Sequence, residues 1–181
     1  MSQRDSGYRR KERDFYETPW WVTETLIHRV RLAEMCRTVW EPAQGTGKMA
    51  RVLEAAGFRV IGSDIDDGTD FLSAAMPAGA DAIVTNPPYE LGQEFCERAL
   101  QHAETVNGVV AMLLRTDFDH AKRRTHLFRD CPAFSKKLVL MQRIAWFVEA
   151  DGKPRASPSF NHAWYIWDWK NAGPPTIVYG P

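Results

Sequence analysis

Residues 38–65 have the pattern of a strand, a tight turn, a helix and a second strand. Residues 38–43 and 59–65 are short and rich in apolar and β-branched side chains, as buried strands are. Residues 44–47 contain Gly45 and Gly47, and the apolar residues that follow recur at helical spacing: Met49, Val52, Leu53 and Ala56. This order is the first half of a dinucleotide-type fold, in which ligands bind at the carboxyl ends of parallel strands.

The glycine turn lacks the spacing of a phosphate-binding loop. It matches neither the dinucleotide fingerprint nor the P-loop, and Glu41 beside it would repel a pyrophosphate. An acidic residue at this place is better matched to a ligand that carries an ammonium group, such as S-adenosylmethionine. Asp64 ends the second strand and can accept both hydrogens of a ribose diol.

A third buried strand is predicted at residues 82–85, and it runs directly into Asn86-Pro87-Pro88-Tyr89. An exocyclic amine becomes nucleophilic only when its hydrogens are pulled out of the plane of its conjugated system. The Asn86 side-chain oxygen and the Pro87 carbonyl are two acceptors that could do this, while Tyr89 offers a face for a flat ring. The alternative interpretation is a surface turn, because Asn and Pro are ordinary turn residues.

Composition indicates an ordinary globular protein. The chain has 181 residues, of which 44% are hydrophobic and 25% charged, which suits one domain with a substantial core. We find no signal peptide and no apolar run that would span a bilayer, so a cytoplasmic protein without membrane partners is expected. The cysteines are Cys36, Cys96 and Cys131, and their wide spacing favours free thiols over a metal site.

The formal net charge is zero, but it is unevenly distributed. Residues 1–13 carry five basic and two acidic groups, and residues 115–137 carry seven basic and three acidic groups. Residues 40–104 carry four basic and eleven acidic groups. Two basic segments around an acidic middle would fit a polyanion-binding face opposite a cofactor site. Solvated loops and helix faces are the alternative.

These motifs, in this order, resemble those of the S-adenosylmethionine-dependent amino-group methyltransferases, in particular the DNA adenine-N6 methyltransferases. Tyr16-Glu17-Thr18-Pro19 resembles a further cofactor motif of that family, and the resemblance covers about residues 15–115. It implies a Rossmann-like class I methyltransferase fold: an α/β architecture with a mostly parallel sheet, an antiparallel last strand and helices on both faces. It also implies S-adenosylmethionine as the cofactor, and no metal.

The resemblance also implies roles for individual residues. It assigns to cofactor binding Thr18, Pro19, Glu41, Ala43, Gly45, Gly47, Asp64, Ile65, Asp70, Phe71 and Asn86. It assigns to the catalytic turn Asn86, Pro87, Pro88 and Tyr89. One departure from the family concerns residues 66–69, which leave no room for the helix usual between these strands. We therefore expect that helix to be missing and this edge of the sheet to be exposed.

The remaining elements complete one domain at residues 15–170, preceded by a mobile basic segment at 1–14. Thr18 is expected to cap a helix with Pro19 at its first position. Further along, the pattern predicts a helix at 91–104, a strand at 106–114, and a hairpin-like pair formed by 137–148 and 164–169. The tail, 171–181, is expected to be an extended strap outside the core.

Two segments are candidates for substrate recognition. Residues 116–136 hold Lys122, Arg123 and Arg124, which we expect to contact nucleic-acid phosphate. Residues 149–162 hold Phe160, a candidate to pack against an extruded base. The alternatives are a solvated basic helix for the first and a core role for Phe160.

The predicted function is methyl transfer to the adenine N6 amine in DNA by base extrusion and direct displacement. RNA adenine and protein glutamine are the alternative acceptors, and an inactive cofactor-binding subunit is the alternative without catalysis. With no separate target-recognition domain visible in the sequence, a homodimer or a partner subunit would supply recognition, unless the two candidate segments suffice. Such a small enzyme suits a bacterial or phage-infected cell.

Overall fold

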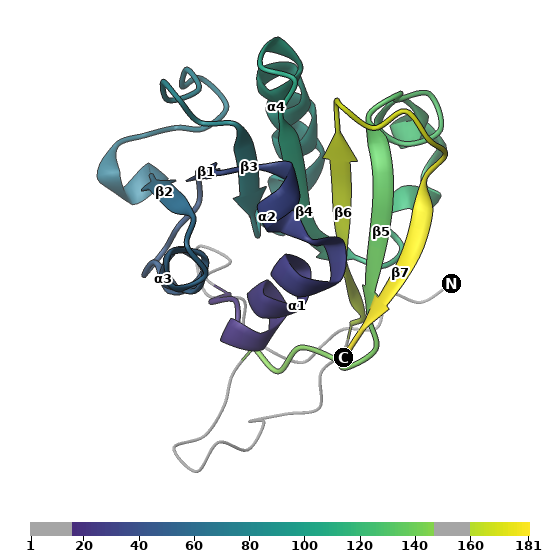
Figure 1. Cartoon of the computed structure of the whole chain (residues 1–181), viewed down its shortest axis with the longest axis horizontal. Coiled ribbons are helices and arrows are strands. Elements are labelled where there is room, and N and C mark those ends of the chain that lie inside the picture. Colours follow the sequence, from purple (N-terminus) through teal and green to yellow (C-terminus); the bar gives the residue numbers. More distant parts are fainter. Residues whose placement is uncertain (1–15, 147–159) are drawn as a thin grey trace.

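The computed structural model describes residues 16–146 and 160–181, and within these ranges the chain forms one seven-stranded sheet (Figure 1). The strand order is β2-β1-β3-β4-β6-β5-β7. The strands are β1 (Thr38–Glu41), β2 (Arg59–Gly62), β3 (Ala82–Thr85), β4 (Val109–Arg115), β5 (Phe134–Leu140), β6 (His162–Asp168) and β7 (Thr176–Gly180). The predicted basic segment 1–14 lies outside the described residues, as do residues 149–159.

Strand direction confirms the predicted architecture. Strand β6 runs antiparallel to both of its neighbours, β4 and β5, and every other pair in the sheet is parallel. The carboxyl ends of β1, β3, β4 and β5 therefore meet at one edge. The loops that carry the predicted motifs leave the sheet at that edge.

Helices cover both faces of the sheet. On one face lie α1 (Trp20–Val30), α2 (Leu32–Met35) and α3 (Lys48–Ala55), and α4 (Gly92–Thr105) lies on the other (Figure 1). Strand β4 explains the two layers, because Val109, Ala111 and Leu113 join one core cluster and the residues between them join the other. Among the described residues, no helix has the length and apolarity that crossing a bilayer requires.

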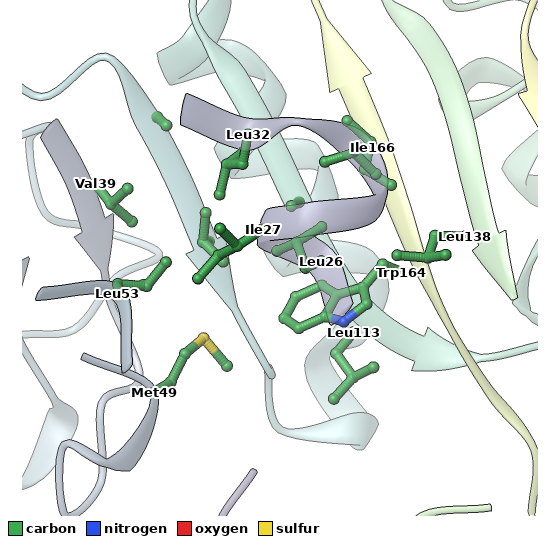
Figure 2. Packing of buried hydrophobic residues seen from close by; sticks show 14 of the residues in the cluster. Leu26, Ile27, Leu32, Val39, Met49, Leu53, Leu113, Leu138, Trp164 and Ile166 are labelled. Carbon is green, nitrogen blue, oxygen red and sulfur yellow. The ribbon is translucent and has the colours of Figure 1, made fainter. Parts of the chain in front are cut away.

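The core beneath α1 is built from long aliphatic side chains around one tryptophan (Figure 2). Leu26 and Ile27 of α1 pack towards the sheet, where they meet Trp164 of β6. The indole Nε1 of Trp164 donates a hydrogen bond to the Val22 carbonyl at 3.0 Å, so a polar contact as well as apolar packing joins the helix to the sheet. This fixes the start of α1, which follows the predicted cofactor motif.

The Trp164→Phe substitution should lower the free energy of unfolding by about 1–2 kcal/mol, because it removes a buried hydrogen bond and part of a packed ring. Trp169→Phe is the matched control, since the Trp169 Nε1 is buried without a partner among the described residues. The free energy of unfolding of Trp169→Phe should equal that of the wild type or be slightly higher. Urea unfolding of the two variants checks the prediction, and equal losses would contradict it.

The predicted cap of α1 is wrong by one residue. The helix begins at Trp20 with Pro19 as its N-cap, and no side chain in the described part of the chain caps it. The Pro19 backbone is extended, with ψ of 146°, which excludes it from the helix. Thr18 therefore lies one residue further out and lines the pocket described below.

The predicted absence of a helix after the second strand is confirmed. Residues Ile65–Asp67 form one 3₁₀ turn, η1, and β2 is the edge strand of the sheet. Gly68 ends this turn with a φ of 83°, a left-handed conformation that glycine adopts without strain. The chain then returns directly to β3 through residues 69–81.

The other edge of the sheet differs from the prediction. Residues Thr176–Gly180 form β7, which pairs in parallel with β5, so the tail is an edge strand and not a strap outside the core. The prolines at 174 and 175 precede this strand and do not interrupt its pairing. Strand β5 also begins three residues earlier than predicted and ends at Leu140, where its pairing with β7 ends.

Residues 116–133 connect β4 to β5 across the face that α4 covers. They contain two 3₁₀ helices, η3 (Phe118–His120) and η4 (Lys122–Leu127), where the alternative prediction was a basic amphipathic helix. The indole of Trp167 donates to the Leu127 carbonyl at 2.6 Å, and Leu127 and Phe128 are buried. This segment therefore packs on the sheet and is part of the core.

Candidate active site

A pocket lies at the carboxyl edge of the sheet, between the ends of β1, β2 and β3. The empty space within it, including space open to solvent, is about 1020 Å³. Most of the residues predicted to bind a cofactor line it: Thr18, Glu41, Ala43, Gly45, Asp64, Ile65, Asp70, Phe71 and Asn86. Pro88 of the proline turn also lines it.

Two backbone conformations shape the glycine turn. Gly45 has a φ of 53° and Gly47 a φ of 74°, both in the left-handed region where a side chain is disfavoured. Asp64 holds the turn, since its Oδ2 accepts the Gly45 N–H at 2.9 Å and its Oδ1 accepts the Asp66 N–H at 3.1 Å. The predicted ribose-binding carboxylate thus also ties β1 to β2.

Glu41 is the buried acidic residue of the pocket. It ends β1 and is only 2% exposed, and burial raises the pKa of its carboxyl group to about 8. Its Oε2 is buried and has no hydrogen-bond partner in the part of the chain that the structure describes. A carboxylate in this position is stabilised by a cation, so the residue fits a ligand that brings an ammonium group.

A polar cluster joins the segment before α1 to the glycine turn. The Thr46 hydroxyl donates to Glu17 Oε1 at 2.5 Å, and Lys48 pairs with Glu17 Oε2. These two bonds, that of Lys48 first, hold the pKa of Glu17 below its usual value. None of these three residues was predicted to have a role, although Glu17 lies within the Tyr16-Glu17-Thr18-Pro19 motif.

The far wall of the pocket is apolar. Ile65 lines the pocket and is 62% exposed, so its side chain is open to contact with a ligand there. Phe71 is buried against Trp40 and Phe95, with ring centroids 5.0 and 4.7 Å away. Asp70 lies at the surface of the pocket, and its Oδ1 accepts the Leu72 N–H at 3.0 Å.

The proline turn follows β3 and presents the Asn86 side chain to the pocket. The Asn86 Nδ2 donates to the Tyr16 carbonyl at 3.0 Å. Because a carbonyl only accepts, this bond sets which end of the amide faces Tyr16 and which faces away. The Asn86 Oδ1 is buried and has no partner among the residues described, so the turn holds an acceptor that a ligand N–H could satisfy.

An aromatic cluster adjoins the proline turn, and we call it the Tyr89 cluster: Tyr16, Tyr89, Trp146 and His162. The ring of Tyr89 is 5.7 Å from that of Tyr16, which itself lines the pocket. Trp146 and His162 were not predicted to take part. They lie after β5 and at the start of β6, so only the three-dimensional fold brings them to this turn.

The remaining predicted residues lie outside the lining of the pocket. Pro19 and Gly47 do not line it, although each is next in sequence to a residue that does, Thr18 and Thr46 respectively. Phe160 lies under the Arg115 guanidinium, whose Cζ is 4.1 Å from the ring centroid. Arg124 donates to the Phe118 carbonyl and lies over the Phe118 ring at 3.9 Å, whereas Lys122 and Arg123 are exposed.

Neither a protein-family model nor a curated protein sequence matches the chain. Solved structures do match its fold. One is a proposed RNA methyltransferase from Pyrococcus horikoshii. The match covers 87% of this chain and 92% of the Pyrococcus chain, with a TM-score of 0.59 and 15% identity. The plantazolicin methyltransferase BpumL was solved with a triazolic desmethylplantazolicin analogue and S-adenosylhomocysteine. Its match covers 84% of this chain and 86% of the BpumL chain, with a TM-score of 0.52 and 13% identity.

A third similar structure is the methyltransferase subunit of a type I restriction-modification system from Streptococcus thermophilus. It has a TM-score of 0.57 and 14% identity and covers 91% of this chain. The chain spans 47% of that subunit, about half its length. At these identities the likeness establishes the fold, so the chain has the Rossmann-like fold of these methyltransferases.

Proposed function

We propose that the chain transfers a methyl group from S-adenosylmethionine to the N6 amine of adenine in DNA. The observation that carries this proposal is the buried Oδ1 of Asn86 at the edge of the pocket, which has no hydrogen-bond partner within residues 16–146 and 160–181. An acceptor with nothing to accept costs free energy, and proteins retain such groups where a ligand satisfies them. An amine with two hydrogens, attached to a flat ring, fits this acceptor and the adjoining aromatic cluster.

The residues present fit the cofactor. Glu41 would hold its ammonium group, since none of the residues that the structure describes is a hydrogen-bond partner for its buried Oε2. Asp64 would accept the ribose hydroxyls, Ile65 would pack on the adenine, and Thr18, Ala43, Gly45, Asp70 and Phe71 would line the rest. When bound, S-adenosylmethionine supplies an electrophilic methyl group on a sulfonium sulfur. The structure of the complex between S-adenosylhomocysteine and a protein of similar fold supports this choice.

Asn86 would orient the amine and would not act as a base, because an amide is too weakly basic. Its Oδ1 would accept one N6 hydrogen and the Pro87 carbonyl the other, which pulls both out of the ring plane. Positive charge grows on N6 as the new bond forms, and the two acceptor dipoles stabilise it more in the transition state than in the ground state. An adenine reaches this turn only after leaving the base stack.

DNA is the first choice of substrate because one protein of similar fold belongs to a restriction-modification system. Lys122 and Arg123, both exposed, are the proposed phosphate contacts, and Arg124 is not, because Phe118 holds it. Since that restriction-modification protein is a subunit about twice as long as this chain, target recognition by a homodimer or a partner subunit belongs to the same proposal.

RNA adenine is the second candidate, and the similarity to a proposed RNA methyltransferase favours it. The experiment that separates the candidates is methyl transfer from labelled S-adenosylmethionine to duplex DNA, structured RNA and a glutamine-bearing protein, side by side. We expect label in DNA. Label in RNA alone would move the proposal to the second candidate. Cofactor binding with no transfer to any acceptor would identify an inactive cofactor-binding subunit.

A further inference from the structure

Tyr89 of the proline turn is tied to a buried histidine from another part of the sheet. Its Oη lies 3.1 Å from Nε2 of His162, and the two ring centroids are 5.8 Å apart. His162 begins β6 and lies opposite Arg115, the last residue of β4. The contact therefore joins the turn after β3 to the strand pair next to it, across 73 residues of sequence.

The environment of His162 keeps its ring neutral. The residue is 2% exposed, and burial is the main reason that its pKa falls to about 4, with the charge of Arg115 adding to the effect. A neutral imidazole has one donor and one acceptor nitrogen, and we assign Nε2 as the acceptor of the Tyr89 hydroxyl proton, which places the ring proton on Nδ1.

The rest of the Tyr89 cluster holds the same ring from other sides. Trp146 packs edge-on against His162, with centroids 5.1 Å apart and planes at 84°, and edge-on against Tyr89 at 6.3 Å. Tyr16 contacts the Tyr89 ring and also accepts the hydrogen bond from Asn86. One set of contacts thus sets both the plane of the Tyr89 ring and the direction of the Asn86 amide.

We propose that His162 is a positioning residue, which fixes Tyr89 and thereby the flat ring that carries the acceptor amine relative to Asn86. The inference rests on the proposed function, because it takes Tyr89 as the surface against which that ring lies. A misplaced acceptor slows the chemical step more than it weakens binding of the cofactor. The effect of losing His162 should therefore appear in kcat, with cofactor affinity unchanged.

The test is a double-mutant cycle of Tyr89→Phe and His162→Phe, which remove the donor and the acceptor of one bond and keep both rings. Each single variant should lower kcat about five- to tenfold, as expected for one hydrogen bond. The double variant should lower it by the same factor and not by the product of the two. His162→Gln, which retains an acceptor, should recover most of the loss.

Three further readouts separate positioning from a general structural defect. Cofactor affinity should stay close to that of the wild type in all variants, and the melting temperature should fall only by the amount that one buried hydrogen bond accounts for, with every variant still folded. The ¹⁵N resonance of the His162 Nε2 should move towards that of a free acceptor nitrogen in Tyr89→Phe. His126→Phe is the control, because that histidine also makes one hydrogen bond, to Glu97 at 2.9 Å, and lies outside the Tyr89 cluster.

Two failures have different meanings. A wild-type chain that methylates no acceptor would overturn the proposed function, and with it this inference. An active wild type whose two single variants have multiplicative effects, or no effect on kcat, would overturn the role of His162 alone. A loss in His162→Phe that is accompanied by unfolding, and is not recovered in His162→Gln, would also contradict it.

Discussion

Asn86→Ala is expected to lower the rate of methyl transfer by a factor on the order of 10³, as does the loss of one preorganised polar group that stabilises a transition state. The reason is the position of the Asn86 Oδ1, which is buried at the pocket and has no partner among the described residues. Removal of the side chain takes away the acceptor that would hold the amine. Single-turnover kinetics with saturating cofactor measures this step directly.

Cofactor affinity should change only a few-fold in Asn86→Ala, because the contacts proposed for the ammonium and ribose groups come from other residues. Asn171→Ala is the matched control. Its Nδ2 also donates to a backbone carbonyl, that of Gly173 at 2.7 Å, but it lies in the turn before β7. Equal activity of the two variants would show that the Asn86 amide has only the structural role of holding Tyr16.

Glu41→Gln is expected to weaken binding of S-adenosylmethionine by about 10- to 100-fold, the range of a hydrogen bond between charged groups. The carboxylate of Glu41 is 2% exposed and burial raises its pKa to about 8, so in the ligand-free protein it is protonated through most of the neutral range. Binding of an ammonium group requires the ionised form. Affinity in the wild type should therefore rise between pH 6 and 7.5, and Gln at this position should abolish that rise.

The same substitution should stabilise the ligand-free protein at high pH. Because the folded-state pKa of Glu41 lies above the usual glutamate value of 4.5, the folded protein retains a proton that the unfolded chain releases. Stability is then highest below pH 4.5 with respect to this group, and it falls by up to about 1.4 kcal/mol per pH unit until pH 8. Glu41→Gln should flatten this decline.

Titration calorimetry and thermal unfolding at several pH values check both effects of Glu41. Glu54→Gln is the control, since Glu54 is an exposed glutamate of α3 that does not line the pocket. A Glu41→Gln variant that binds the cofactor as tightly as the wild type would exclude Glu41 as the ammonium site. A stability profile with the same pH dependence in both proteins would show that burial does not perturb this carboxyl group.

The parts of the fold that sequence reasoning predicts are those whose signals are local. Buried strands such as β3 and β4 are continuous apolar runs, and Gly45 and Gly47 mark the turn after β1 through their own backbone preferences. Strand β7 has no such signal, because it is held by pairing with β5 along one side, and two prolines precede it. Edge strands of this kind depend on tertiary contacts that a short sequence does not encode.

The candidate site divides in the same way. Glu41, Gly45, Asp64 and Asn86 end strands or follow them closely, so their convergence at the pocket follows from a parallel sheet. Trp146 and His162 could not be found like this, since each lies more than fifty residues from Tyr89 and belongs to no motif. Arg124 shows the converse, because its charge indicated a phosphate contact while the structure gives it the Phe118 carbonyl and ring.

The most direct test of the central proposal is to identify the methylated atom. Duplex DNA would be incubated with the protein and S-adenosylmethionine, digested to nucleosides and analysed by mass spectrometry, with Asn86→Ala in parallel. We predict N6-methyldeoxyadenosine with the wild type and none above background with the variant. Methylation of a carbon atom, or equal product from both proteins, would contradict an amine held at Asn86 and with it the proposed function.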